Sequence, residues 1–149
     1  MSTLTPSARR CRIQLLAVPE SLHHVRRQLL EFLTDAGYTT WVNDTVRLAV
    51  SEACANVVLH AYGPESGPLR VEAVITPQAE LFVSVRDEGR GFQAYDESPH
   101  TGFGLPLMAS LADNLSIDST TEGTAICLTF DLFGKRLLDE KPFPSGNDD

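Results

Sequence analysis

Hydrophobic and polar residues follow two different spacings along this chain of 149 residues. Five segments alternate between apolar and polar positions, which is typical of strands that bury one face: residues 12–18, 69–76, 80–87, 114–119 and 124–132. Three segments repeat apolar residues every three to four positions, which predicts amphipathic helices: residues 21–36, 40–62 and 105–112. The predicted order of elements is therefore βααββαββ.

Residues at the ends of the predicted helices support these boundaries. Ser21, which follows a proline and a glutamate, is a candidate N-cap for the first helix, and Gly37 is placed to end it. Thr39 and Thr40 are candidate caps for the second helix. Glycines and prolines at residues 63–68 break that helix and predict a loop.

The order of elements predicts the fold class. Helices need an apolar sheet face to cover, and each predicted strand has one. We therefore predict an α+β fold, a two-layer sandwich with the helices on one face of a mixed, mainly antiparallel sheet. The other sheet face is left for water or a partner. Residues 11–133 form the single domain in this interpretation, between a mobile N-terminus at 1–10 and a loosely ordered tail at 134–149.

Charge and cysteine content narrow the function classes. The formal net charge of −8, with no lysine- or arginine-rich run to offset it, argues against a nucleic-acid partner. The three cysteines are scattered and form no CxxC motif, which favours reduced thiols over disulfides or a zinc site. No apolar run is long enough to cross a membrane, and residues 1–10 do not resemble a signal peptide. We expect a cytoplasmic protein that does not contact a membrane.

A polar stripe along the helix at 40–62 is the first candidate for chemistry. Glu52, Asn56 and His60 are spaced four residues apart beside the apolar face. Their desolvation is costly without polar partners. Asn56 can supply an oxygen to magnesium, and Glu52 can accept a proton from an attacking hydroxyl or water. We interpret His60 as a structural residue that packs or caps near the end of the helix.

Two glycine motifs follow the stripe. Asp87-x-Gly89-x-Gly91 ends a strand, where glycines allow close approach to a flat ligand and the carboxylate can accept from an exocyclic amine. Gly102-x-Gly104 opens a helix, whose unpaired N–H groups suit phosphate. Each motif alone is more often structural, but the three together predict a nucleotide site.

The same residues resemble a known family. SEACANVVLHAY at 51–62, VRDEGRGF at 85–92 and GFGLPLMASLAD at 102–113 are similar to the small anti-sigma-factor serine kinases, also called switch-protein kinases. These kinases belong to the GHKL superfamily, which shares the Bergerat-type ATP site. A late glycine-threonine turn at 123–124 also resembles the family, and the match spans roughly residues 13–130.

The resemblance implies a GHKL fold, ATP and Mg²⁺ as cofactors, and a role for each matching residue. Glu52 is implied as the general base and Asn56 as the magnesium ligand. The residues implied at the adenine ring are Asp87, Gly89, Gly91 and Thr124. Those implied to close over the phosphates are Gly102, Gly104 and Leu105. The implied substrate is a serine or threonine of an anti-anti-sigma (switch) protein, the second implied partner is a sigma factor, and the implied assembly is a homodimer.

Two alternatives stay open at this point. The segment at 92–101 is short, and a phenylalanine interrupts the glycines before Leu105, which leaves open a nucleotide-binding anti-sigma module with little or no kinase activity. A detached catalytic domain of a sensor histidine kinase is less favoured, because no helical segment with a phosphoacceptor histidine precedes the domain. Arg26 and Arg27 on the first helix are candidates for partner contact, and a solvated helix face is an equally good interpretation of them.

Overall fold

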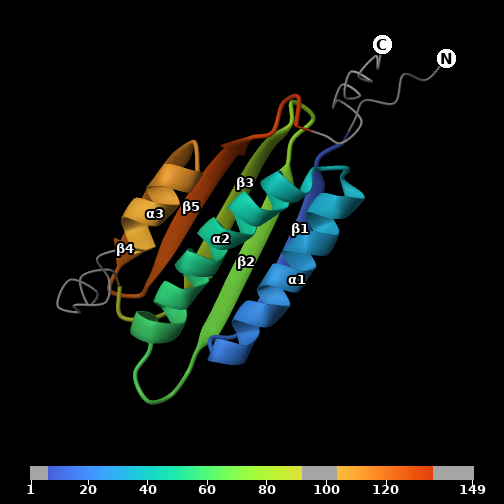
Figure 1. Cartoon of the computed structure of the whole chain (residues 1–149). Helices are drawn as coiled ribbons and strands as arrows, with labels where there is room; N and C mark the ends of the chain where they lie inside the picture. Colours follow the sequence, from blue (N-terminus) through green and yellow to red (C-terminus); the bar gives the residue numbers. More distant parts are fainter. Residues whose placement is uncertain (1–6, 92–103, 136–149) are drawn as a thin grey trace, which may run out of the picture.

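The computed structural model describes residues 7–91 and 104–135, and its elements follow the predicted order (Figure 1). The strands are β1 (Arg9–Leu16), β2 (Pro68–Ile75), β3 (Glu80–Asp87), β4 (Asn114–Thr120) and β5 (Gly123–Asp131). The helices are α1 (Pro19–Asp35), α2 (Thr40–Asn56) and α3 (Gly104–Leu111), and a π-helical turn, η1 (Val57–Ala61), continues α2.

The strands form one five-stranded sheet in the order β1-β2-β3-β5-β4. All four pairings are antiparallel, so the prediction of a mixed sheet was wrong in this detail. The pairings are antiparallel because β2 and β3 form a hairpin, β4 and β5 form a second one, and long helical connections place the remaining strands beside them. The prediction of a two-layer α+β sandwich is confirmed.

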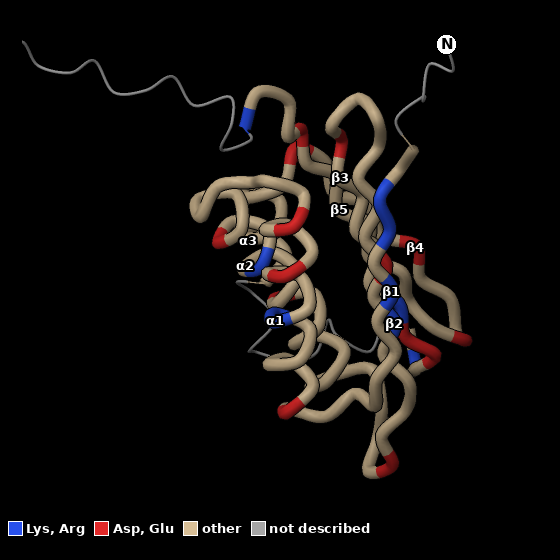
Figure 2. Tube along the Cα trace, turned by 90° about the vertical axis from the view of Figure 1, so that its right-hand side faces the viewer, with Lys and Arg blue, Asp and Glu red and all other residues tan. Residues whose placement is uncertain are grey.

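The helices cover one face of this sheet, and Figures 1 and 2 show the two layers from two sides. The central helix α2 packs against both α1 and α3. Alternate residues of the strands point into the core, which explains the period-two pattern of the sequence; on β3 these are Leu81, Val83 and Val85, all buried. No helix within the described ranges is both long and apolar enough to span a bilayer.

The predicted boundaries of α1 and β1 were wrong. Helix α1 begins at Pro19, whose fixed φ suits the first helical position, and Val18 is its N-cap. Ser21 is not the cap: its buried hydroxyl donates to the carbonyl of Leu16. Strand β1 begins at Arg9, three residues earlier than predicted, because its first residues pair with the end of β2.

The predicted ends around the α1–α2 connection are confirmed. Gly37 follows α1 with a φ of +88°, a conformation that glycine adopts at little cost, and its N–H donates to the Thr34 carbonyl at 2.9 Å. Thr39 is the N-cap of α2, and its Oγ1 accepts from the Val42 N–H at 3.3 Å.

The packing of α1 predicts a large difference between two leucines of the same helix. Leu33 is completely buried and Leu30 is 38% exposed. We expect Leu33→Ala to lower the free energy of unfolding by about 2–5 kcal/mol, because it leaves a cavity in the core. The control Leu30→Ala should lower it by less than about 1 kcal/mol. Urea denaturation of both variants measures this, and equal losses would contradict the described packing.

Candidate functional site

Glu52 and Asn56 lie against the start of α3. A methyl group added at Gly104 would lie 3.3 Å from Asn56 Oδ1, 3.4 Å from Asn56 Nδ2 and 3.7 Å from Glu52 Oε2. Both polar side chains are half-buried, and Gly104 is buried. The structure therefore brings the stripe on α2 and the second glycine motif together, and a larger residue at position 104 would crowd both functional groups.

The turn after β3 is hydrogen-bonded to the π-helical turn that follows Asn56. The backbone N–H of Arg90 donates to the Ala61 carbonyl at 2.9 Å, and Arg90 Nη2 donates to the His60 carbonyl at 3.0 Å. Gly89 approaches so closely that a methyl group there would overlap the Ala61 carbonyl. The glycine is required by this approach, which joins the first glycine motif to the end of α2.

Asp87 and Thr124 face each other across β3 and β5 at the same end of the sheet. Asp87 is only 7% exposed, and its Oδ1 accepts from the Gly89 N–H at 2.8 Å. Thr124 is buried as well, with its hydroxyl 3.0 Å from the Ser119 hydroxyl. Gly123 has a φ of +149°, and a methyl group there would overlap the Asp87 carbonyl. A buried carboxylate and a buried hydroxyl thus lie at the sheet end next to the Gly89 turn.

Four predicted residues remain. Gly91 has a φ of +88° and approaches the Thr120 carbonyl, which leaves no room for a side chain. Leu105 lies in the first turn of α3, half-buried against the core. Gly102 lies outside the described residues. His60 is half-buried and contributes its carbonyl to the Arg90 contact, while its structural role stays a prediction.

Three features of the site were not predicted. The first is the π-helical turn itself, because its apolar residues continue the helical spacing of α2 without a break. The second is Tyr62, whose hydroxyl donates to the Pro68 carbonyl at 2.5 Å and accepts from the Glu88 N–H at 2.8 Å. Burial raises the pKa of Tyr62, with smaller effects of both signs from neighbouring groups. These bonds hold the loop before β2 against the turn after β3.

The third unpredicted feature is a contact behind Glu52. Arg26 of α1 donates through Nε to the buried Ser51 hydroxyl at 2.8 Å. Ser51 directly precedes Glu52, so this bond holds α1 against the part of α2 that carries the carboxylate. The prediction that Arg26 contacts a partner is not tested by this arrangement.

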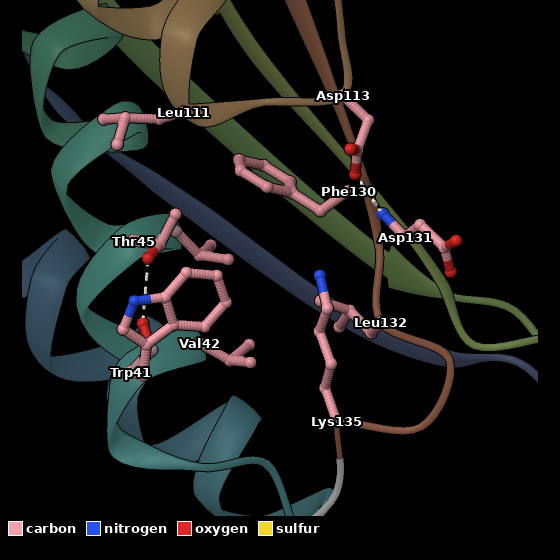
Figure 3. A pocket seen from close by; sticks show the side chains of 10 residues that line it. Trp41, Val42, Thr45, Leu111, Asp113, Phe130, Asp131, Leu132 and Lys135 are labelled. Atoms are coloured by element: carbon pink, nitrogen blue, oxygen red, sulfur yellow. Dashed lines mark hydrogen bonds between the residues drawn. The ribbon is translucent and has the colours of Figure 1, made fainter.

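A separate cavity lies at the other end of α2 (Figure 3). It has a volume of about 110 Å³, and Trp41, Leu111, Phe130 and Lys135 are among its lining residues. The Lys135 ammonium lies 5.5 Å from the centre of the Trp41 ring. Trp41 and Glu52 are about 17 Å apart along the axis of α2 at 1.5 Å per residue, so this cavity is not part of the predicted site.

The residues present fit a nucleotide with magnesium better than a transition metal. Within the described ranges, no three His, Cys, Asp or Glu side chains gather as metal ligands. The hard oxygens near Gly104 are those of Asn56 and Glu52, and magnesium commonly takes one or two protein oxygens with phosphates and water. The space that Gly104 leaves beside these oxygens is a cradle that a Cβ atom would fill.

Comparisons with known proteins agree with this geometry. A family model described as histidine kinase-like ATPase domain matches residues 15–130. The chain belongs to this family. The predicted resemblance to GHKL serine kinases is confirmed by relatives within it.

Two curated relatives align with this chain over most of its length and over most of their own length. The serine-protein kinase RsbW of Bacillus velezensis is 32% identical over 141 residues, which are 84% of this chain and 87% of the relative. The anti-sigma F factor of Clostridium acetobutylicum is 30% identical over 128 residues, with 78% and 89% covered.

Two solved structures share the fold. The RsbU and RsbW domains of Rv1364c from Mycobacterium tuberculosis match with a TM-score of 0.68 and 27% identity, over 82% of this chain and 32% of that one. The histidine kinase domain of the blue-light activated kinase of Erythrobacter litoralis EL346 matches with a TM-score of 0.55 and 24% identity, over 67% and 50%, which shows the fold alone.

The contact between Gly89 and Ala61 predicts that Gly89→Ala is costly. We expect a loss of unfolding free energy on the order of 2 kcal/mol, because the added methyl must push the turn away from the π-helical turn. Gly63→Ala is the matched control, since no atom lies within 4 Å of its added methyl, and it should change the value by less than about 0.5 kcal/mol. Urea denaturation compares the two, and a neutral Gly89→Ala would contradict the close approach.

Proposed function

We propose that this protein is an ATP-dependent serine/threonine-protein kinase that acts as an anti-sigma factor. The observation that carries the proposal is the placement of a glutamate carboxylate and an asparagine amide beside the start of α3, where Gly104 leaves space. The fold belongs to the histidine kinase-like ATPase family, and relatives covering most of the chain are named serine-protein kinase RsbW and anti-sigma F factor.

Glu52 is the general base in this proposal. It accepts the proton of a substrate hydroxyl while that oxygen bonds to the γ-phosphorus of ATP and ADP leaves. Asn56, one helical turn later, would hold Mg²⁺ through Oδ1 together with phosphate oxygens. The bound ion supplies positive charge that neutralises the phosphates. The half-buried position of both side chains limits their freedom and supports the positioning that phosphoryl transfer requires.

The other predicted residues shape the nucleotide pocket. The buried Asp87 carboxylate accepts from the adenine amine, with Thr124 beside it, and Gly89 and Gly91 form the adjacent wall. The N–H groups at the start of α3, with Gly102, Gly104 and Leu105, close over the phosphates. The close glycine contacts at Ala61 and Thr120 support this arrangement, because both turns are held where a ligand needs a backbone wall.

The names of the relatives favour a kinase over a binding module without phosphoryl transfer. The segment at 92–101 that motivated the binding module falls outside the described residues. The likeness to a histidine kinase domain concerns the fold alone.

The partners of the proposed kinase are an anti-anti-sigma protein as substrate and a sigma factor that it sequesters. The proposal includes a homodimer that acts in the cytoplasm. The names of the relatives, anti-sigma F factors, support the sigma factor as a partner. The anti-anti-sigma protein and the homodimer are further parts of the proposal.

Glu52→Gln tests the kinase. With ATP, Mg²⁺ and the cognate anti-anti-sigma protein, we expect the variant to transfer phosphate about 10²–10⁴-fold more slowly, because the amide cannot accept the proton. Nucleotide binding measured by calorimetry should be retained. Glu65→Gln, in the exposed loop before β2, is the control and should match the wild type. A wild type that yields no phosphoprotein, or a Glu52→Gln variant as active as the wild type, would remove the kinase proposal.

Asn56→Ala tests the magnesium site separately. We expect the variant to bind ATP roughly tenfold or more weakly than the wild type in Mg²⁺, because an oxygen ligand is lost. In EDTA the two proteins should bind ATP alike. Asn114→Ala on β4 is the control. Fluorescence titration with a labelled ATP analogue measures both conditions, and an unchanged magnesium dependence in Asn56→Ala would refute the assignment.

A further inference from the structure

The face of the sheet opposite the helices carries a hollow of about 350 Å³ on β1, β2 and β3. The polar residues that line it are Arg12, Gln14, Arg70, Glu72, Ser84 and Arg86. They point outward because the alternate residues of each strand, such as Val71 and Val85, are buried under the helices. Helices within the described ranges all lie on the other face, and Figure 2 shows Lys and Arg positions along β1 and β2 in the sheet layer.

This hollow is rich in arginine although the chain has a net charge of −8. Glu72 lies 3.5 Å from Arg10 and 3.8 Å from Arg12, and Arg70 lies 3.2 Å from Glu88. These ion pairs are exposed and contribute little to stability. Arg86 makes no ion pair with any residue that the structure describes. Among the residues that the structure describes, the hollow itself is lined by three arginines and one glutamate.

The register of the sheet places two of these arginines directly opposite each other. Arg70 of β2 is the cross-strand partner of Arg86 of β3. Like charges at directly opposed positions of an antiparallel pair destabilise the sheet. An anion between the two guanidinium groups would remove this repulsion and form charge-assisted hydrogen bonds with both.

The neighbouring residues favour a protein segment as the source of the anion. Ser84, a small residue opposite Glu72, forms the floor beside the arginines. Two residues earlier on β3, Phe82 is 43% exposed and stands opposite Val74. A free inorganic anion would leave this apolar area unused, whereas a peptide can bind arginine with carboxylates and cover the phenylalanine with an apolar side chain.

Two other occupants fit less well. A second copy of the chain would place the same patch on both sides of a two-fold interface, so two hollows that each carry three arginines and one glutamate would face each other. A nucleic acid carries a phosphate at every residue, and the carboxylates of Glu72 and Glu88 lie within the patch and repel such a polyanion. A peptide can space its carboxylates and place donors opposite these glutamates.

We propose that the outer face of β1, β2 and β3 is a docking surface for an acidic protein segment. Its carboxylates bind between Arg70 and Arg86, and one of its apolar side chains packs on Phe82. This surface lies on the opposite side of the sheet from Glu52 and Asn56, so the proposal does not depend on kinase activity or on bound nucleotide.

The test uses the full-length protein and two fluorescent peptides of twelve residues. One repeats Glu-Leu-Asp-Glu, and its counterpart repeats Gln-Leu-Asn-Gln. We expect the acidic peptide to bind at least roughly tenfold more tightly in fluorescence anisotropy at about 20 mM NaCl, and to weaken at about 300 mM because the contacts are screened. Arg86→Glu should weaken binding of the acidic peptide about tenfold or more, because the reversed charge repels its carboxylates. Arg27→Glu, an equal charge change on α1, should leave it within about twofold.

Several results would overturn the proposal. They are equal binding of the two peptides, no binding of the acidic peptide, or equal losses in Arg86→Glu and Arg27→Glu, which would indicate a general charge effect. Tighter binding of a twelve-residue oligothymidylate would assign the face to nucleic acid. Self-association that Arg86→Glu abolishes would assign it to a second copy.

A second measurement needs no ligand. If the Arg70–Arg86 pair is repulsive, Arg86→Gln should raise the melting temperature at low salt, and the gain should shrink as salt screens the charges. A lower melting temperature for Arg86→Gln would show that Arg86 stabilises the fold itself and would contradict the proposed reason for its position.

Discussion

The close approach of Gly89 to the carbonyl of Ala61 holds together the two parts of the candidate site. One part is the end of α2 with its π-helical turn, and the other is the turn after β3 that begins with Asp87. The Arg90 N–H donates to the same Ala61 carbonyl, so the close approach of the glycine and a backbone hydrogen bond fix the turn at the same carbonyl. The Arg90 guanidinium bond to the His60 carbonyl and the Tyr62 bond to the Glu88 N–H join the same two parts, so Asn56 and Asp87 are held relative to each other by several contacts around this point.

The two elements that meet at this contact, α2 and β3, are each held by packing and pairing with their neighbours. Helix α2 is packed between α1 and α3 over a core of alternate strand residues, and β3 is paired on both sides, with β2 and β5. Gly104 then brings the start of α3 to Glu52 and Asn56, and Gly123 brings β5 to Asp87. Three glycines that lie far apart in the sequence thus act in the same way, by letting their backbone approach a polar group on another element, a carbonyl at Gly89 and Gly123 and a side-chain amide at Gly104.

Much of this arrangement was predictable from the sequence because its signals are local. The period-two strands, the stop at Gly37 and the cap at Thr39 depend on neighbouring residues. The Ser21 cap was wrong because the proline two residues earlier already starts α1. The Tyr62 hydrogen bonds could not be predicted, because they arise from contacts with β2 and the turn after β3. The π-helical turn was missed because its apolar residues continue the helical spacing of α2. The opposed Arg70 and Arg86 likewise appear only once the strand register is known.

The most direct test of the central claim is a nuclear magnetic resonance titration of the protein with ADP and Mg²⁺. If nucleotide binds where α2, the turn after β3 and α3 meet, the amide signals of Ala61, Gly89, Gly104 and Thr124 should shift together with one dissociation constant. The signals of Arg12 and Trp41, on the outer sheet face and at the other end of α2, should stay unchanged. Shifts concentrated around Trp41, or no shifts at all, would contradict the account.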